Sequence, residues 1–219
     1  MDNALRHAWT ALISAADLDD HMHQVGQAAA NAELLQSILD SSAREKPVNL
    51  LIAGAGTAQF LDYIPATCLT PFHLTLSDIN ESFLKRAEER CDRAGLSDVR
   101  FVVDDIEVTQ LMGPYQVIAV TLVLEHIDWR RGLRGIYRLA PDHLHIVIQC
   151  NPEGLVEAIA PGRKLNLSMQ AFADFAHPIL VSSEQLIDFL GRLGYRLTAQ
   201  QDRRVADNKT MLALSFMRD

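Results

Sequence analysis

The chain has 219 residues, of which 48% are hydrophobic and 22% are charged. These proportions predict a folded protein with one sizeable core and exclude a disordered chain. The formal net charge of −8 argues against nucleic acid as a partner, because nucleic-acid binders usually carry a basic surface. The longest apolar stretch, residues 117–124, is too short to span a bilayer, so we expect no membrane partner.

The cysteine content and the N-terminal residues predict a cytoplasmic protein. The three cysteines are an odd number, have no metal-ligand spacing and are interpreted as reduced thiols. The first residues lack the basic start and the apolar run of a signal peptide. We therefore expect a cytoplasmic location and no metal site.

The first third of the chain predicts two helices followed by a strand, a turn and a second strand. Apolar residues recur at helical spacing over residues 5–16 and 25–39, and we expect these helices to join around residues 17–20. Residues 48–53 form an apolar strand that runs into the glycine turn 54–58. A second apolar strand, residues 73–77, ends on Asp78.

The middle of the chain alternates helices with further strands. Asn80 is a good N-cap for a helix whose apolar stripe covers residues 83–94 and which stops at Gly95. Strands are expected over residues 99–103, 115–120 and 143–149, with a helix over 129–137 that Pro141 ends. Such alternation is typical of a parallel sheet with helices on both faces.

The last third begins with an irregular segment and ends with a hairpin. Residues 151–181 have mixed character and are interpreted as short helices and loops, in which surface solvation explains Arg163, Lys164 and His177 better than contact with a substrate. A capping box at Ser182 starts a helix. Strands 195–201 and 210–216 follow, and the segment between them is too short for a crossover helix, so the two strands are antiparallel.

Two features near the first two strands point to a nucleoside-containing cofactor. Gly54 and Gly56 let a ligand approach backbone N–H groups, because no Cβ stands in the way. Asp78, at the tip of the next strand, can accept hydrogen bonds from both hydroxyls of a ribose. The simpler alternatives are a tight exit from a buried strand and an acid that favours the dipole of the following helix.

Four segments in this order resemble the class I S-adenosylmethionine-dependent methyltransferases. They are residues 53–57 (AGAGT), 76–79 (LSDI), 103–106 (VDDI) and 122–127 (LVLEHI), and the resemblance covers residues 48–219. It implies an α/β fold, a doubly wound, seven-stranded, mostly parallel sheet with a terminal antiparallel hairpin. Residues 1–45 are then an N-terminal helical cap and 46–219 the methyltransferase domain, with 151–181 as an excursion on the substrate side.

The resemblance also implies S-adenosylmethionine as the cofactor and assigns its contacts. The glycine turn would lie against the methionine part and Asp78 would hold the ribose. Asp104 or Asp105 would contact the adenine amino group, and we favour Asp104 with Ile106 near the ring. The full set of expected cofactor-binding residues is Gly54, Ala55, Gly56, Asp78, Ile79, Asp104, Asp105, Ile106, Thr121 and Leu122.

His126, beside Glu125, is the candidate catalytic residue. A histidine with a pKa near neutrality can remove a proton from a nucleophilic oxygen or nitrogen as the methyl group moves. A structural role for the pair is the alternative. The chain also departs from the family at two positions: Ile52 replaces a common acid, and Ala58 replaces the third glycine of the turn, which is tolerated if its φ is negative.

These observations predict methyl transfer to a small-molecule acceptor. The N-terminal helices either pad the edge of the sheet or fold over the site as a lid, with Trp9 and residues 21–27 near the substrate. A non-catalytic scaffold with the same fold is the alternative function. A nicotinamide-dependent oxidoreductase is less consistent, because its fingerprint needs glycine where Gln59 stands. The acceptor is not identified, and a homodimer stays open.

Overall fold

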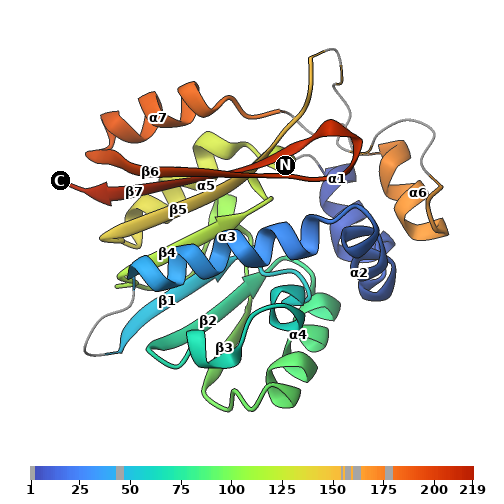
Figure 1. Cartoon of the computed structure of the whole chain (residues 1–219), viewed down its shortest axis with the longest axis horizontal. Helices are drawn as coiled ribbons and strands as arrows, with labels where there is room; N and C mark the ends of the chain where they lie inside the picture. The colour runs from blue at the N-terminus through green and yellow to red at the C-terminus, as the bar shows by residue number, and fades with distance from the viewer. Residues whose placement is uncertain (1–2, 43–46, 154, 156–158, 160–163, 176–179) are drawn as a thin grey trace.

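The computed structural model describes residues 3–42, 47–153, 155, 159, 164–175 and 180–219. It contains a seven-stranded sheet with the strand order β3-β2-β1-β4-β5-β7-β6 (Figure 1). Strands β1 to β5 are mutually parallel, whereas β7 runs antiparallel to both β5 and β6. The predicted doubly wound sheet with a terminal antiparallel hairpin is therefore confirmed. The strands are β1 (Val48–Ala53), β2 (Phe72–Asp78), β3 (Val99–Val103), β4 (Val117–Thr121), β5 (His143–Cys150), β6 (Tyr195–Arg204) and β7 (Thr210–Arg218).

Helices cover both faces of this sheet and one of its ends. Figure 1 shows the helices α1, α2 and α6 gathered at one end of the molecule, beside the end of α3. The α-helices are α1 (Asn3–His7), α2 (Ala15–Gln24), α3 (Gln27–Ser42), α4 (Glu81–Arg93), α5 (Trp129–Arg138), α6 (Leu167–Phe175) and α7 (Ser183–Arg192), and a π-helical turn, η1 (Ala8–Leu12), follows α1.

Alternation along the central strands builds two apolar layers. Leu50 and Ile52 of β1 pack with residues of α3 and α4 on one face. Leu51 and Ala53 face the other side and pack with residues of α5 and α7. Because successive side chains of a strand point to opposite faces, a strand buried on both sides reads as one continuous apolar run. This burial fixes the sheet and leaves the carboxyl ends of the strands to carry the loops.

The predicted helix starts and strand positions agree closely with the structure. Strands β1 and β3 have the predicted bounds, and both hairpin strands are longer than predicted. Asn80 caps α4 by accepting hydrogen bonds from the N–H groups of Ser82 and Phe83. Ser182 caps α7 by accepting from Gln185. Gly95, which ends α4, has a φ of +75°, the left-handed conformation that glycine adopts without a Cβ clash.

The prediction for the N-terminal helices is wrong at their junction. Residues 17–20 lie inside α2, and the chain breaks instead at Ile13, before α2, and at Val25–Gly26, after it. Ser14 starts α2 by accepting a hydrogen bond from the Asp17 N–H. His21 and His23 consequently lie in the last turn of α2.

Some predictions fall outside the described residues. The proposed boundary between residues 45 and 46 lies there, as do Arg163, His177 and much of the excursion 151–181. The division into a cap and a methyltransferase domain therefore stays a prediction. Within the described ranges, none of the helices combines the length and apolar character needed to cross a membrane. Cys68, Cys91 and Cys150 form no disulfide.

Candidate functional site

A large cavity lies at the carboxyl ends of β1, β2, β3 and β4. Its volume is about 1040 Å³ when the part open to solvent is included. It is the place where ligands bind in open α/β sheets. All the site residues predicted above line it: Gly54, Ala55, Gly56, Asp78, Ile79, Asp104, Asp105, Ile106, Thr121, Leu122 and His126.

The glycine turn after β1 forms one wall of this cavity. Gly54 and Gly56 have φ values of +69° and +55°, in the left-handed region. A Cβ on Gly54 would lie 1.9 Å from Cγ2 of Val123, so the turn packs tightly against the segment after β4. A Cβ on Gly56 would meet no atom within 4 Å. The backbone is therefore held at Gly54 and open to a ligand at Gly56.

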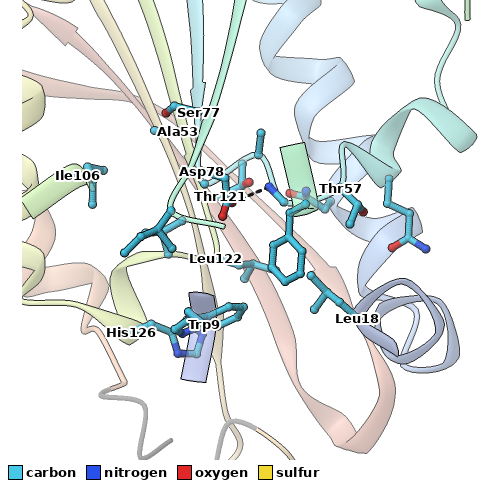
Figure 2. Close-up of a pocket in the computed structure, with 18 of the residues that line it drawn as sticks. Trp9, Leu18, Ala53, Thr57, Ser77, Asp78, Ile106, Thr121, Leu122 and His126 are labelled. Carbon is cyan, nitrogen blue, oxygen red and sulfur yellow. Dashed lines mark hydrogen bonds between the residues drawn. The ribbon is translucent and has the colours of Figure 1, made fainter. Parts of the chain in front are cut away.

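Asp78 ties this turn to the start of α4. Its Oδ2 accepts a hydrogen bond from the Gly56 N–H, the dashed line at Asp78 in Figure 2, and its Oδ1 accepts one from the Asn80 N–H, each at 2.9 Å. Burial raises the pKa of Asp78 to about 6, although these backbone N–H groups act in the opposite direction. Each carboxylate oxygen has a further lone pair. The side chain can therefore accept hydrogen bonds from two ligand hydroxyls.

The two departures from the family occupy different environments. Ile52 is 1% exposed and belongs to the apolar layer beneath α3 and α4. Ala58 has a φ of +53°, so the negative φ under which alanine would be harmless there is not what the structure has. A left-handed alanine costs roughly 1–2 kcal/mol. The turn is therefore strained at the position where the family has its third glycine.

The acids after β3 differ in their partners. Asp104 accepts a hydrogen bond from the Gln110 N–H at 3.0 Å. Asp105 accepts one from the Glu107 N–H at 2.9 Å, and its other oxygen forms an ion pair with Arg6 of α1. Asp105 therefore holds the N-terminal helices against the sheet. Ile106, the next residue, is buried and packs against α5.

The segment after β4 bends sharply into the cavity. Leu122 has a φ of +54°, which is uncommon for a bulky residue and is found where the surrounding structure holds the strain. Its N–H donates to the carbonyl of Val147 at 2.9 Å, which anchors the bend to β5. Thr121 and Leu122 therefore face the cavity from a fixed backbone.

His126 lies at the end of the cavity that Trp9 covers. The two ring centroids are 4.8 Å apart, and Figure 2 shows both side chains together, away from Asp78. Burial lowers the pKa of His126 to about 4, and its Nδ1 has no hydrogen-bond partner among the described residues. The imidazole is therefore neutral at pH 7 and can accept a hydrogen bond, but it is a weak base and not the histidine of near-neutral pKa that proton removal favours. A catalytic role stays a prediction.

Helix α2 contributes to the wall of the cavity and contacts the glycine turn through buried polar side chains. Asp19 of α2 accepts hydrogen bonds from Arg90 of α4 at 2.7 Å and 3.3 Å, and also from the hydroxyl of Thr57 in the glycine turn. Arg90 also donates to the Thr57 carbonyl at 2.9 Å. This cluster of Asp19, Arg90 and Thr57 fastens α2 onto the turn.

Asn31 is a further lining residue that the sequence did not indicate. It lies on α3, and its Oδ1 has no hydrogen-bond partner among the residues that the structure describes. An amide oxygen facing a cavity in this way can accept from a ligand amine or hydroxyl. No local pattern marks it, because its role comes from the packing of α3 beside the turn.

Part of the chain matches a known protein family. Residues 50–142, which contain most of β1 and all of β2 to β4, α4 and α5, match the family model described as a methyltransferase domain. This match covers less than half of the chain, and it indicates a methyltransferase domain over those residues. No curated protein sequence matches the chain.

Solved structures of methyltransferases share this fold. Magnesium protoporphyrin IX methyltransferase from Synechocystis PCC 6803 with bound SAM has a TM-score of 0.63 at 14% identity, over 86% of this chain and 78% of that one. The N-methyltransferase NodS from Bradyrhizobium japonicum WM9 has 0.58 at 18%, over 85% and 84%. Geranyl diphosphate C-methyltransferase from Streptomyces coelicolor A3(2) has 0.62 at 11%, over 84% and 78%. At these identities the likeness is one of fold.

Proposed function

We propose that this methyltransferase moves a methyl group from S-adenosylmethionine to a small-molecule acceptor. The observation that carries the proposal is that the glycine turn and Asp78 line the same cavity, at the carboxyl edge of the sheet. Structural neighbours crystallised with SAM or S-adenosylhomocysteine support the choice of cofactor. Geranyl diphosphate C-methyltransferase, crystallised with geranyl diphosphate, is a neighbour with a small acceptor.

The residues of the cavity fit the parts of this cofactor. Asp78 would accept hydrogen bonds from the ribose hydroxyls, and Ile79 and Ile106 would flank the adenine ring, with Asp104 toward its amino group. The open backbone at Gly56 would face the methionine part, together with the Oδ1 of Asn31, which has no hydrogen-bond partner among the described residues. Bound S-adenosylmethionine supplies a methyl group that its sulfonium makes electrophilic.

The helices over the cavity favour a small acceptor over a macromolecule. Trp9 and Leu18 line the cavity from the N-terminal helices, and Asn80 donates to the Trp9 carbonyl at 2.7 Å. Ser168 of α6 donates to Asp17 of α2 at 2.5 Å, which links the two covering helices. Such a cover excludes water and aligns the reactants, and alignment contributes much of the rate in displacement reactions.

A non-catalytic binding or scaffold protein is the second candidate. The observations in its favour are the buried Ile52, which replaces the family's acid, and the strained Ala58. The two candidates differ in ligand-dependent stability. A cofactor present at 100 times its Kd stabilises the folded state by about 2.7 kcal/mol, whereas a scaffold without a working site gains nothing.

Isothermal titration calorimetry with S-adenosylmethionine and S-adenosylhomocysteine tests the proposal. We expect a micromolar Kd, and we expect Asp78→Ala to weaken binding by roughly tenfold or more, because two hydrogen bonds to a charged acceptor are lost. Asp202→Ala, an exposed acid on β6, is the matched control and should leave the Kd unchanged. No heat with either ligand would contradict the proposal.

A further inference from the structure

A second cavity adjoins the proposed cofactor cavity. Its volume is about 530 Å³ with its open part included, and Trp9, Leu122 and His126 line both cavities. Direct displacement requires the acceptor atom to lie in line with the methyl group of the donor. A cavity that shares three wall residues with the cofactor site is therefore where an acceptor can reach the donor.

The ionisable residues described in the lining of this second cavity are Glu125 and the histidines His21 and His126. Among its described lining residues there is no lysine and no arginine, and Glu125 is the one carboxylic acid. These described residues offer an anionic acceptor no lysine or arginine to pair with. The formal net charge of −8 also favours the approach of a cation over that of an anion.

Glu125 has one oxygen that the described residues leave without a partner. The residue is 4% exposed, and its Oε1 accepts a hydrogen bond from the Gln149 N–H at 2.6 Å. Its Oε2 is buried and has no hydrogen-bond partner within the described part of the chain. Leaving a buried carboxylate oxygen unpaired is costly, and a donor or cation from a ligand would relieve that cost.

The remaining walls suit a ligand with a hydrocarbon body. Ile159, Met169 and Leu180 line the cavity together with the rings of Trp9 and Phe172. The Trp9 centroid lies 4.7 Å from that of Phe172 and 4.8 Å from that of His126, so the three rings form one aromatic group. Aromatic rings attract the positive charge of an ammonium group. An alcohol carries no such charge and is attracted less.

We propose that the second cavity binds a small primary or secondary amine as the methyl acceptor, with the amine nitrogen at Glu125 Oε2 and its hydrocarbon part against Ile159, Met169 and Phe172. This inference rests on the proposed function. It adds the class of acceptor and gives Glu125 a role in binding it.

The transfer balances with Glu125 as the proton acceptor. The ammonium form of the ligand gives one proton to Oε2, which leaves a neutral amine with a free lone pair. That lone pair forms the new N–C bond to the methyl group of the bound sulfonium donor, and the electrons of the broken C–S bond return to sulfur. The products are a methylated ammonium and a thioether. Burial raises the pKa of Glu125 to about 7, so the carboxyl can then release its proton to solvent near neutral pH.

Calorimetry on protein saturated with S-adenosylhomocysteine tests this inference separately from the proposed function. Matched pairs of probes are titrated: hexylamine and 1-hexanol, benzylamine and benzyl alcohol, 2-phenylethylamine and 2-phenylethanol. We expect at least one amine to bind roughly tenfold or more tightly than its alcohol. Glu125→Gln should remove that preference and leave the Kd for S-adenosylhomocysteine unchanged, because glutamine keeps the oxygen that accepts from Gln149.

A control variant and the contrary outcomes of the titration show which part of the account fails. Glu184→Gln, an exposed glutamate of α7 that lines neither cavity, should behave as the wild type. Alcohols binding as tightly as amines, or no probe binding at all, would overturn the amine assignment while the cofactor site stands. An amine preference that survives in Glu125→Gln would remove Glu125 from it. Failure to bind S-adenosylhomocysteine would overturn the proposed function and this inference together.

Discussion

Replacing Arg90 by methionine should strongly destabilise the protein, because it removes the buried cation closest to the Asp19 carboxylate and leaves only the half-exposed Arg86 near it. The side chains of Arg90 and Asp19 are 5% and 10% exposed, and their closest contact is 2.7 Å. Removing one partner of a buried pair costs about 3–5 kcal/mol. The other carboxylate near Arg90, that of Asp62, is 41% exposed, so its loss adds no more than about 1 kcal/mol.

Urea unfolding followed by circular dichroism measures this effect. We expect the free energy of unfolding of Arg90→Met to fall by about 4 kcal/mol with an unchanged m-value. Arg86→Met is the matched control one turn earlier on α4. Arg86 is 43% exposed and 3.7 Å from Asp19, so its replacement should cost less than about 1 kcal/mol. Affinity for S-adenosylhomocysteine should fall in Arg90→Met, since α2 is no longer fastened to the glycine turn.

A second substitution separates charge from packing. The double variant Asp19→Asn, Arg90→Met has no buried carboxylate at position 19. It should therefore be more stable than Arg90→Met alone. A loss for Arg90→Met below about 1 kcal/mol, or equal to that of Arg86→Met, would refute the reasoning that a buried charge holds the cover in place.

Three further outcomes follow from single positions. Gly54→Ala should destabilise the protein by more than the roughly 1–2 kcal/mol of a left-handed alanine, because its Cβ would meet Val123. Gly56→Ala should cost about that amount and should mainly weaken cofactor binding. Urea unfolding measures the first effect and calorimetry the second, and equal losses of stability in the two variants would contradict the prediction. Burial raises the pKa of Glu125 in the folded protein from 4.5 to about 7. The wild type should therefore lose about 3 kcal/mol of stability relative to Glu125→Gln as the pH rises from 4.5 to 7. A difference in the free energy of unfolding that does not depend on pH would contradict this prediction. Ser14→Ala should lower the free energy of unfolding by about 1 kcal/mol through loss of the α2 cap. The control Ser183→Ala should change it by less than about 0.5 kcal/mol. Equal losses for the two variants in urea unfolding would count against the cap.

The sheet could be predicted because its signals are local. The runs at residues 48–53 and 99–103 are apolar or bounded by turn residues, and they became β1 and β3 with the predicted bounds. The short connection at residues 202–209 predicted an antiparallel hairpin, which is present as β6 and β7. The predicted cofactor residues also line one cavity, since they lie at the ends of neighbouring parallel strands.

The cover of the site was harder to predict because its contacts are distant in sequence. The polar run at residues 17–20 looked like a loop, yet Asp19 is buried there because Arg90, 71 residues away, neutralises it. The spacing of Ser14 and Asp17 does carry a local capping signal and would have placed the start of α2 correctly. The surroundings of Glu125 and Asn31 depend on how α3 and β5 pack, which no local pattern encodes.

A crystal structure of the protein soaked with S-adenosylhomocysteine tests the central claim most directly. We expect the ribose hydroxyls within hydrogen-bond distance of Asp78, the adenine ring beside Ile106, and the sulfur turned toward Leu122 and the second cavity. Ligand density elsewhere on the molecule, or a cavity left without ligand at a saturating concentration, would contradict the account.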